Sequence, residues 1–106
     1  MSKWVSVLKK DGLQPGTMVN IKLDGKNILI ANIKDHVYAM LNDCPHLGCL
    51  LHRGSLQEYK LTCPCHDWIF DIRNGEFLAA PEIKIPTFPV KVENGEILVN
   101  LKGVIV

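Results

Sequence analysis

All four cysteines and two of the four histidines of this 106-residue chain lie in two short segments. The first segment reads CPHLGC, from Cys44 to Cys49, and the second reads CPCH, from Cys63 to His66. Cysteine thiolates and imidazoles are ligands for transition metals, and two such segments can share one metal centre. The spacing therefore indicates a metal site at a point where two loops meet.

Each segment offers one thiolate and one imidazole in nearly the same arrangement. Cys44 and His46 are separated by one residue, and Cys63 and His66 are separated by two. In a 2Fe-2S cluster with mixed ligands, both thiolates bind one iron and both imidazoles bind the other. Because neutral imidazoles replace two anionic thiolates, such a cluster accepts an electron more readily. We therefore expect a redox centre with these four ligands.

Zinc is the structural alternative for the same two segments. One zinc ion can be bound by the four cysteines or by two cysteines and two histidines, and it would then stabilise the fold. Zinc fingers usually combine Cys-x2-4-Cys with a following His-x3-5-His, however, and the second segment has only one histidine. The other two histidines, His36 and His52, have no neighbouring ligand, and we expect both to be ordinary surface residues.

Taken together, CPHLGC and CPCH resemble the two boxes of the Rieske iron-sulfur family. The resemblance continues in GSL (Gly54–Leu56) and in WIFDIRNGEFLAAP (Trp68–Pro81). Both stretches are similar to Rieske ferredoxins and to the ferredoxin-like domains of ring-hydroxylating oxygenases. The resemblance implies a 2Fe-2S cluster of the Rieske type, whose buried iron is held by Cys44 and Cys63.

The same resemblance assigns the other residues of the two segments. His46 and His66 would hold the second iron, near the surface, where the electron leaves. Cys49 and Cys65 occupy the positions that a disulfide joins in the Rieske proteins of respiratory cytochrome bc complexes. We expect the same disulfide here, and it would add about 3 kcal/mol in the chain-entropy model. Two reduced thiols are the alternative, because cytoplasmic thiols are usually kept reduced.

Six further residues would surround the cluster: Pro45, Leu47, Pro64, Asp67, Trp68 and Phe70. The prolines restrict the backbone, which suits rigid loops whose N–H groups point at sulfur. The respiratory relatives have Gly-Ser and then Tyr after the second box, where this chain has Asp67, Trp68 and Phe70. Trp68 and Phe70 carry no hydroxyl that can donate to sulfur. We therefore expect a potential in the lower part of the Rieske range, which is about -150 to +300 mV.

The segments that must position this centre have the pattern of short strands and turns. Alternating apolar residues predict strands over 18–23, 26–33 and 36–41, with a tight hairpin turn at Asp24-Gly25. Near the other end, alternation on both sides of Asn94-Gly95 predicts a second hairpin. No window has apolar residues at helical spacing, and six prolines interrupt any long helix.

These signals predict an all-β fold, a Rieske-like antiparallel β sandwich or barrel with a small cluster-binding subdomain formed by two loops. A chain of 106 residues has room for one domain with a real core, so we expect a single Rieske-type domain over 1–106. The cluster-binding subdomain would span about 42–82, because turn residues concentrate there and the two segments must meet in space.

The composition excludes some classes of function. Twelve basic and eleven acidic side chains leave the charge nearly balanced, with no basic run that would favour nucleic acid. No apolar run is long enough for a signal peptide or a membrane span, so we expect a soluble cytoplasmic protein. The chain has no Ser-His-Asp arrangement, no phosphate-binding glycine loop and no mononuclear iron site. We therefore expect an electron-transfer protein rather than an enzyme.

The function that the resemblance implies is that of a Rieske-type ferredoxin. It would be a monomer that carries one electron at a time from a flavin- or NAD(P)H-linked reductase to a terminal oxygenase or another acceptor. One alternative is a non-catalytic small subunit of a reductase such as the nitrite enzyme. A structural zinc module and a redox sensor that switches at Cys49 and Cys65 are further alternatives.

Overall fold

The computed structural model describes residues 4–44, 48–65 and 67–101, which form short strands joined by tight turns. The strands are β1 (Trp4–Lys9), β2 (Thr17–Leu23), β3 (Lys26–Ile33), β4 (His36–Leu41), β5 (Ser55–Gln57), β6 (Lys60–Thr62), β7 (Ile69–Asp71), β8 (Glu76–Phe77), β9 (Ala80–Lys84), β10 (Thr87–Phe88), β11 (Val90–Glu93) and β12 (Glu96–Asn100). Two single turns of 3-10 helix, η1 (Lys10–Gly12) and η2 (Leu51–Arg53), lie between the strands. Neither could cross a membrane.

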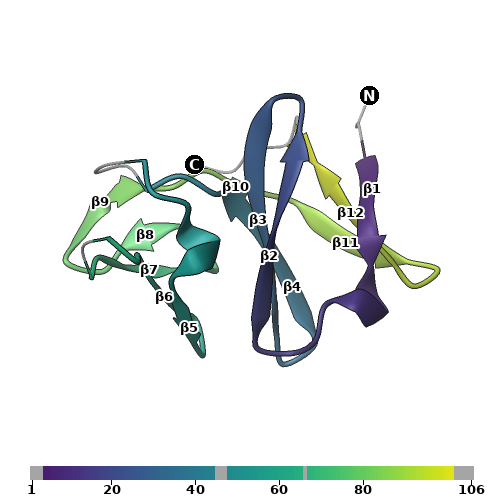
Figure 1. Cartoon of the computed structure of the whole chain (residues 1–106), viewed down its shortest axis with the longest axis horizontal. Coiled ribbons are helices and arrows are strands. Elements are labelled where there is room, and N and C mark those ends of the chain that lie inside the picture. Colours follow the sequence, from purple (N-terminus) through teal and green to yellow (C-terminus); the bar gives the residue numbers. More distant parts are fainter. Residues whose placement is uncertain (1–3, 45–47, 66, 102–106) are drawn as a thin grey trace.

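The strands form three antiparallel sheets that lie side by side along the longest axis of the molecule (Figure 1). The central sheet has the order β10-β4-β3-β2, and the sheet β1-β12-β11 lies on one side of it. The five-stranded sheet β5-β6-β7-β8-β9 lies on the other side, and we call it the loop-bearing sheet. The all-β antiparallel prediction is confirmed.

The central strand β3 is buried on both faces because it separates two hydrophobic cores. Leu29, Ala31 and Ile33 pack into the core shared with the loop-bearing sheet. Ile28 and Ile30 point the other way, into the core shared with β12. Successive side chains of a strand point to opposite faces, so one apolar strand can serve two cores. This strand therefore ties the loop-bearing sheet to the rest of the molecule.

The two predicted hairpin turns are present, and their residues have the positive φ values that such turns need. Asp24 and Gly25 have φ values of 50° and 76°, and Asn94 and Gly95 have φ values of 52° and 77°. Two consecutive residues with positive φ form the tight turn whose twist matches a hairpin. The strands predicted over 18–23, 26–33 and 36–41 are likewise confirmed as β2, β3 and β4. Residues 4–9, for which no strand was predicted, form β1 and pair with β12.

The strands of the loop-bearing sheet are short, with two to five residues each, and consecutive strands pair as hairpins. β6 pairs with β5 and β7, and the connection from β6 to β7 contains the second cysteine segment. The connection from β4 to β5 contains the first segment and η2. The two cysteine segments are therefore both loops that enter or leave this one sheet.

Candidate metal centre

The first loop folds back on itself directly after Asn42. The backbone N–H of Cys44 donates to the carbonyl of Cys49 at 3.0 Å, and that of Gly48 donates to the carbonyl of Cys44 at 2.7 Å. Gly48 has a φ of 73°, and a Cβ there would lie 3.3 Å from a carboxylate oxygen of Asp43. Glycine is the residue that adopts this conformation without strain. Cys44 itself is buried, at 1% exposed.

The second loop has a similar closure between β6 and β7. The backbone N–H of Cys63 donates to the carbonyl of Trp68 at 2.8 Å, and that of Asp67 donates to the carbonyl of Cys63 at 3.3 Å. Cys63 is 1% exposed, whereas Pro64, Cys65 and Asp67 are exposed at the tip. Asp67 has a φ of 61°, which turns the chain back toward β7.

The two loops are held together at two points. Cys49 and Cys65 are joined by a disulfide with a Cα to Cα distance of 6.6 Å. Gly54, which follows η2, lies so close to β6 that a Cβ there would collide with the carbonyl oxygen of Thr62. Only glycine permits such a close approach of two backbones. The ends of both loops are thus fixed relative to each other.

The expected iron ligands are only in part among the described residues. Cys44 and Cys63 stay outside the disulfide and belong to the same buried hydrophobic cluster. His46 and His66, with Pro45 and Leu47, lie outside the described residues. Within the described part, no group of three Cys, His, Asp or Glu side chains gathers to hold a metal.

The two buried thiols fit a cluster of the predicted kind. Both cysteines lie at loop ends that main-chain bonds close and that the disulfide joins. A bound metal ion deprotonates a coordinating thiol outright. The donor set therefore suits a metal with thiolate ligands on its buried side.

An aromatic group backs the second loop. Trp68 stacks on Phe77 with centroids 4.1 Å apart and an angle of 5° between the ring planes. Phe70 is fully buried and lies 5.5 Å from Phe77. Trp68 directly precedes β7 and Phe70 lies in the middle of it, whereas Phe77 comes from β8 and was not among the residues expected around the cluster. The aromatic rings, rather than hydroxyl donors, occupy this side of the loop.

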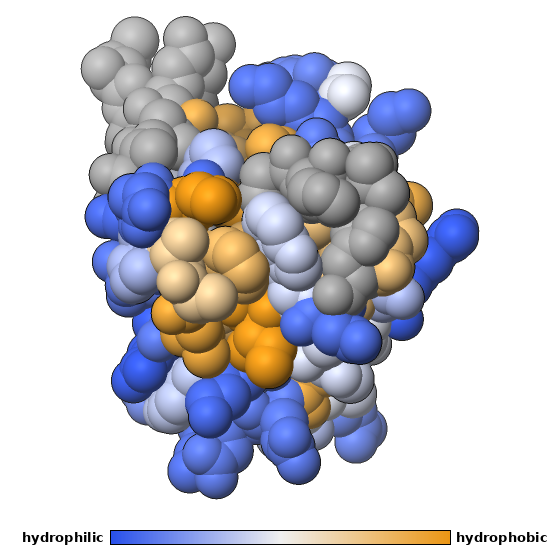
Figure 2. Space-filling model, turned by 90° about the vertical axis from the view of Figure 1, so that its left-hand side faces the viewer, coloured by the Kyte–Doolittle hydropathy of each residue, from blue (hydrophilic) through white to orange (hydrophobic). Residues whose placement is uncertain are grey.

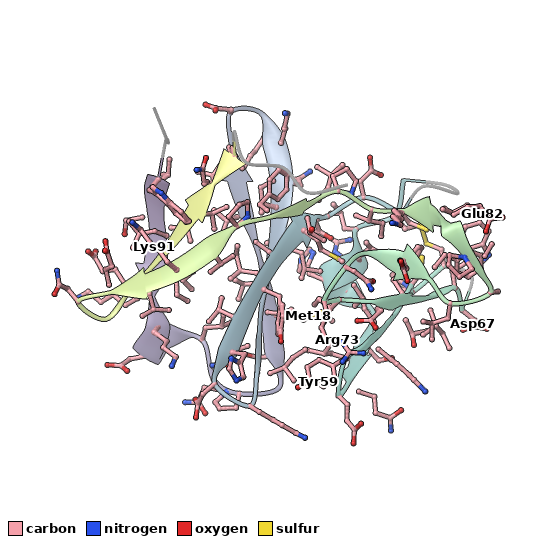
Figure 3. All side chains as sticks on the ribbon, turned by 180° about the vertical axis from the view of Figure 1, so that it is seen from behind. Met18, Tyr59, Asp67, Arg73, Glu82 and Lys91 are labelled. Atoms are coloured by element: carbon pink, nitrogen blue, oxygen red, sulfur yellow. A yellow bond between two sulfur atoms is a disulfide. The ribbon has the colours of Figure 1, made fainter. Side chains whose placement is uncertain are left out.

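A second aromatic group joins the loop-bearing sheet to β4. Tyr38 and Tyr59 meet edge to face at 6.3 Å, and the guanidinium of Arg73 lies 4.3 Å from the centroid of the Tyr59 ring. Arg73 also donates to both carboxylate oxygens of Asp71, at 3.0 and 2.8 Å. These hydrogen bonds lower the pKa of Asp71, and burial raises the pKa of Tyr38. Figure 3 shows Tyr59 and Arg73 close to Met18, where the loop-bearing sheet meets the central sheet.

The loop-bearing end has an apolar face with a hydrophilic border. Figure 2 looks onto this end, and hydrophobic residues form a continuous area there with hydrophilic side chains around it. Among the described residues of this half, Leu78 is the most exposed large apolar side chain, at 44%. Asp67 and Glu82 lie at this end, opposite Lys91 in the far sheet (Figure 3).

His36 is the surface residue that we expected, whereas His52 makes a contact that was not expected. His36 is exposed at the start of β4. His52 is half-buried in η2, and its ring Nδ1 lies 2.8 Å from the side-chain amide nitrogen of Asn42. Sequence spacing gave no sign of this contact, because Asn42 and His52 are brought together only when the first loop closes.

Solved structures of similar shape include small electron-transfer proteins. The ferredoxin of carbazole 1,9a-dioxygenase from Nocardioides aromaticivorans has a TM-score of 0.85 and 31% identity, over 92% of this chain and 97% of that one. A ferredoxin seen in complex with the reduced oxygenase of carbazole 1,9a-dioxygenase has a TM-score of 0.85 and 27% identity, over 92% of each chain. A putative NADH-dependent nitrite reductase small subunit from Mycobacterium tuberculosis has a TM-score of 0.86 and 26% identity, over 94% and 96%.

Sequence relatives agree with these structures. The ferredoxin component of the naphthalene 1,2-dioxygenase/salicylate 5-hydroxylase systems of a Ralstonia species is 31% identical over 100 residues, which is 93% of this chain and 96% of that protein. Sulredoxin from Sulfurisphaera tokodaii is 33% identical over 92% of this chain and 98% of its own length. The family model of the Rieske [2Fe-2S] domain matches residues 3–89. With two cysteine loops joined at one end of an all-β fold, the chain belongs to the Rieske [2Fe-2S] domain family.

Proposed function

We propose that this protein is a one-electron carrier with a Rieske-type 2Fe-2S cluster, and that it is not itself an enzyme. Its relatives are ferredoxin components of oxygenase systems, and the chain spans nearly their whole length. The observation that carries the proposal is the pair of buried cysteines on two loops that are tied together at one end of the molecule. When bound, the cluster accepts and releases one electron.

The proposed ligands are Cys44 and Cys63 for the inner iron and His46 and His66 for the outer iron. The burial of both cysteines supports the first pair. The position of His46 and His66 in the same two loops supports the second pair, since each lies within three residues of a buried cysteine. The role of the chain around them is to exclude water from the sulfur side and to hold both loops rigid.

We propose that the electron leaves to a terminal oxygenase and arrives from a flavin- or NAD(P)H-linked reductase. Support for the first partner comes from the solved complex of a related ferredoxin with an oxygenase. The apolar face with a hydrophilic border at the loop-bearing end suits transient docking of such a partner. We further propose a cytoplasmic monomer, folded as one domain whose residues 42–82 form the cluster-binding part.

The disulfide between Cys49 and Cys65 is proposed to be a permanent link between the loops. Its supporting observation is the Cα to Cα distance of 6.6 Å, which lies within the range that a disulfide spans. The redox-sensor alternative draws on the exposure of Cys65. Titration of free thiols in the purified protein, with and without a reductant, distinguishes a permanent link from a reversible switch.

The decisive experiment is a visible absorption and low-temperature EPR spectrum of the purified protein, before and after dithionite. A mixed-ligand cluster gives a coloured protein whose reduced form has a rhombic signal with a low average g value. A colourless protein with one bound zinc ion would contradict the carrier function. Metal analysis of the same sample identifies which metal the thiols hold.

A second candidate function is that of a small subunit of a nitrite reductase, which the similar structure from Mycobacterium tuberculosis favours. A subunit of this kind would serve a structural role in a larger enzyme. Reduction of the bound cluster by a reductase, followed by its reoxidation by a purified oxygenase, supports the carrier. Stable co-purification with a reductase catalytic subunit and no exchange of electrons supports the subunit.

A further inference from the structure

Asn42 is a buried polar residue whose side chain is fully engaged. It is 1% exposed and follows β4 directly. Its amide nitrogen donates to the side-chain oxygen of Asn20 at 2.8 Å and lies 2.8 Å from Nδ1 of His52. Its side-chain oxygen accepts the backbone N–H of His52 at 3.0 Å. Its own backbone N–H donates to the carbonyl of Asn27 at 2.8 Å.

The direction of these hydrogen bonds follows from the groups involved. A backbone N–H can only donate, so the side-chain oxygen of Asn42 must face the N–H of His52. The amide nitrogen then faces the ring and Asn20, and it has one hydrogen for each. Nδ1 of His52 must therefore accept, and the ring proton is on Nε2. We call this two-point contact between Asn42 and His52 the loop clasp.

The loop clasp closes the first cysteine loop at its base. Asn42 precedes Cys44 by two residues, and His52 follows Cys49 by three. The chain between the two clasped residues thus contains a proposed iron ligand and one half of the disulfide. Asn42 is itself attached to the central sheet through Asn20 of β2.

The same short helix also sets the position of the second loop. Gly54, at the end of η2, lies against the carbonyl of Thr62, and Thr62 directly precedes Cys63. A displacement of η2 therefore moves the base of the second loop as well. Both cysteine loops take their position from η2, and η2 takes its position from Asn42 through His52.

We propose that Asn42 is a positioning residue for the metal centre, acting through His52 to set the relative placement of Cys44 and Cys63. The proposal rests on the proposed function only in taking Cys44 and Cys63 as iron ligands. An amide is the group that fits here, because it accepts from the backbone N–H and donates to the ring at once. Alanine makes neither bond and leaves buried polar groups without partners.

The test compares Asn42→Ala with a control at a buried asparagine of the central sheet. Asn32 is also 1% exposed, and its amide donates to the carbonyl of Leu13 at 2.8 Å, far from the clasp in the chain. Asn32→Ala therefore removes a comparable buried hydrogen bond without touching the cysteine loops. Both substitutions are neutral, so neither adds a charge that would itself change a reduction potential.

A second pair of variants tests the ring contact without changing Asn42. His52→Ala removes the acceptor at Nδ1. His52→Asn restores an acceptor, because the side-chain oxygen of asparagine is two bonds from Cβ, as Nδ1 is in histidine. Both keep the backbone N–H that Asn42 accepts. Because His52 is only half-buried, we expect these variants to fold even if Asn42→Ala does not.

Three readouts are measured on the purified oxidised protein and after dithionite: the EPR line widths, the reduction potential, and hydrogen exchange of the peptide covering 42–54. Asn42→Ala and His52→Ala are expected to broaden the lines, shift the potential and speed exchange of that peptide about ten-fold. His52→Asn is expected to return all three toward the wild-type values. Asn32→Ala is expected to lower the melting temperature while leaving the lines and the potential unchanged.

Two outcomes would overturn the proposal. One is wild-type line widths and potential in both Asn42→Ala and His52→Ala. The other is an equal change in Asn32→Ala, which would mean that any loss of stability disturbs the centre. A wild-type protein without a Rieske signal would instead contradict the proposed function, and the exchange of peptide 42–54 would still report whether the loop clasp holds the loop.

Discussion

The indole of Trp68 lies flat on the ring of Phe77, with centroids 4.1 Å apart and the planes within 5° of parallel. Trp68 comes directly after the second cysteine loop, and its carbonyl accepts the N–H of Cys63. The stack therefore connects the loop that carries a proposed ligand to the strand β8. Phe70 is fully buried and also contacts Phe77. The three rings therefore form an apolar support beneath the second loop.

Phe70→Ala is expected to destabilise the protein by about 3 to 5 kcal/mol, because it removes a fully buried ring and leaves a cavity. Leu78→Ala, at a side chain that is 44% exposed, is the control and should change stability by less than about 0.5 kcal/mol. Urea unfolding followed by tryptophan fluorescence measures both. A small effect at Phe70 would show that the aromatic group is not part of the folded core.

His46→Ser and His66→Ser are each expected to abolish the rhombic EPR signal of the reduced protein, because serine cannot replace an imidazole on iron. His36→Ser, at an exposed residue away from both loops, should leave the signal intact. Optical and EPR spectra of the three variants make the comparison. An unchanged signal in either ligand variant would contradict the ligand assignment.

Removal of the disulfide by Cys49→Ser and Cys65→Ser together is expected to cost about 3 kcal/mol, since the link spans 16 residues. Wild-type protein treated with a strong reductant should lose a similar amount of stability, whereas the double variant should not respond to the reductant. Chemical unfolding with and without reductant measures these differences. Equal stability of all four samples would show that the two thiols are reduced in the native protein.

Gly54→Ala is expected to cost about 3 kcal/mol and to lower the amount of bound cluster, because the new Cβ collides with the carbonyl of Thr62. Gly12→Ala is the matched control, since a Cβ at that glycine meets no atom within 4 Å and its φ is not positive. Unfolding curves and iron content of the two variants are compared. Full iron content in Gly54→Ala would mean that the two loops are positioned independently.

The ion pair of Asp71 with Arg73 predicts a pH dependence of stability. Arg73 lowers the pKa of Asp71 in the folded protein below its ordinary value of 3.8. A carboxyl group with a lowered pKa stabilises the fold above its unfolded pKa, and this contribution disappears as the pH falls through the folded pKa. The stabilisation from the ion pair is therefore fully present at pH 7, and it is lost as the pH falls below 3.8 and Asp71 becomes protonated.

Arg73→Gln should accordingly destabilise the protein only slightly at pH 7, because the guanidinium is largely exposed and solvent screens the ion pair. The difference from wild type should shrink in acid, leaving only the lost contact with the Tyr59 ring. Urea unfolding at neutral pH and near pH 3 measures it. A difference that grows in acid would contradict the sign of the Asp71 shift.

Local patterns were enough to predict the central hairpins and the candidate site. Alternation over 26–33 and the pairs Asp24-Gly25 and Asn94-Gly95 are decided by strand periodicity and by which residues tolerate positive φ, both short-range properties. β1 was missed because its partner β12 lies at the other end of the chain. An edge strand of this kind is stabilised by pairing that no local window contains.

By itself, the sequence determined which residues can bind a metal, because thiols and imidazoles in two short segments are a chemical property of the residues. It also determined the turns and the all-β class. Only the tertiary structure decided that Cys44 and Cys63 are buried in one core, that Phe77 stacks on Trp68, and that Asn42 clasps His52. These contacts join elements that are separate in the chain, and they form only when the sheets pack and both loops close.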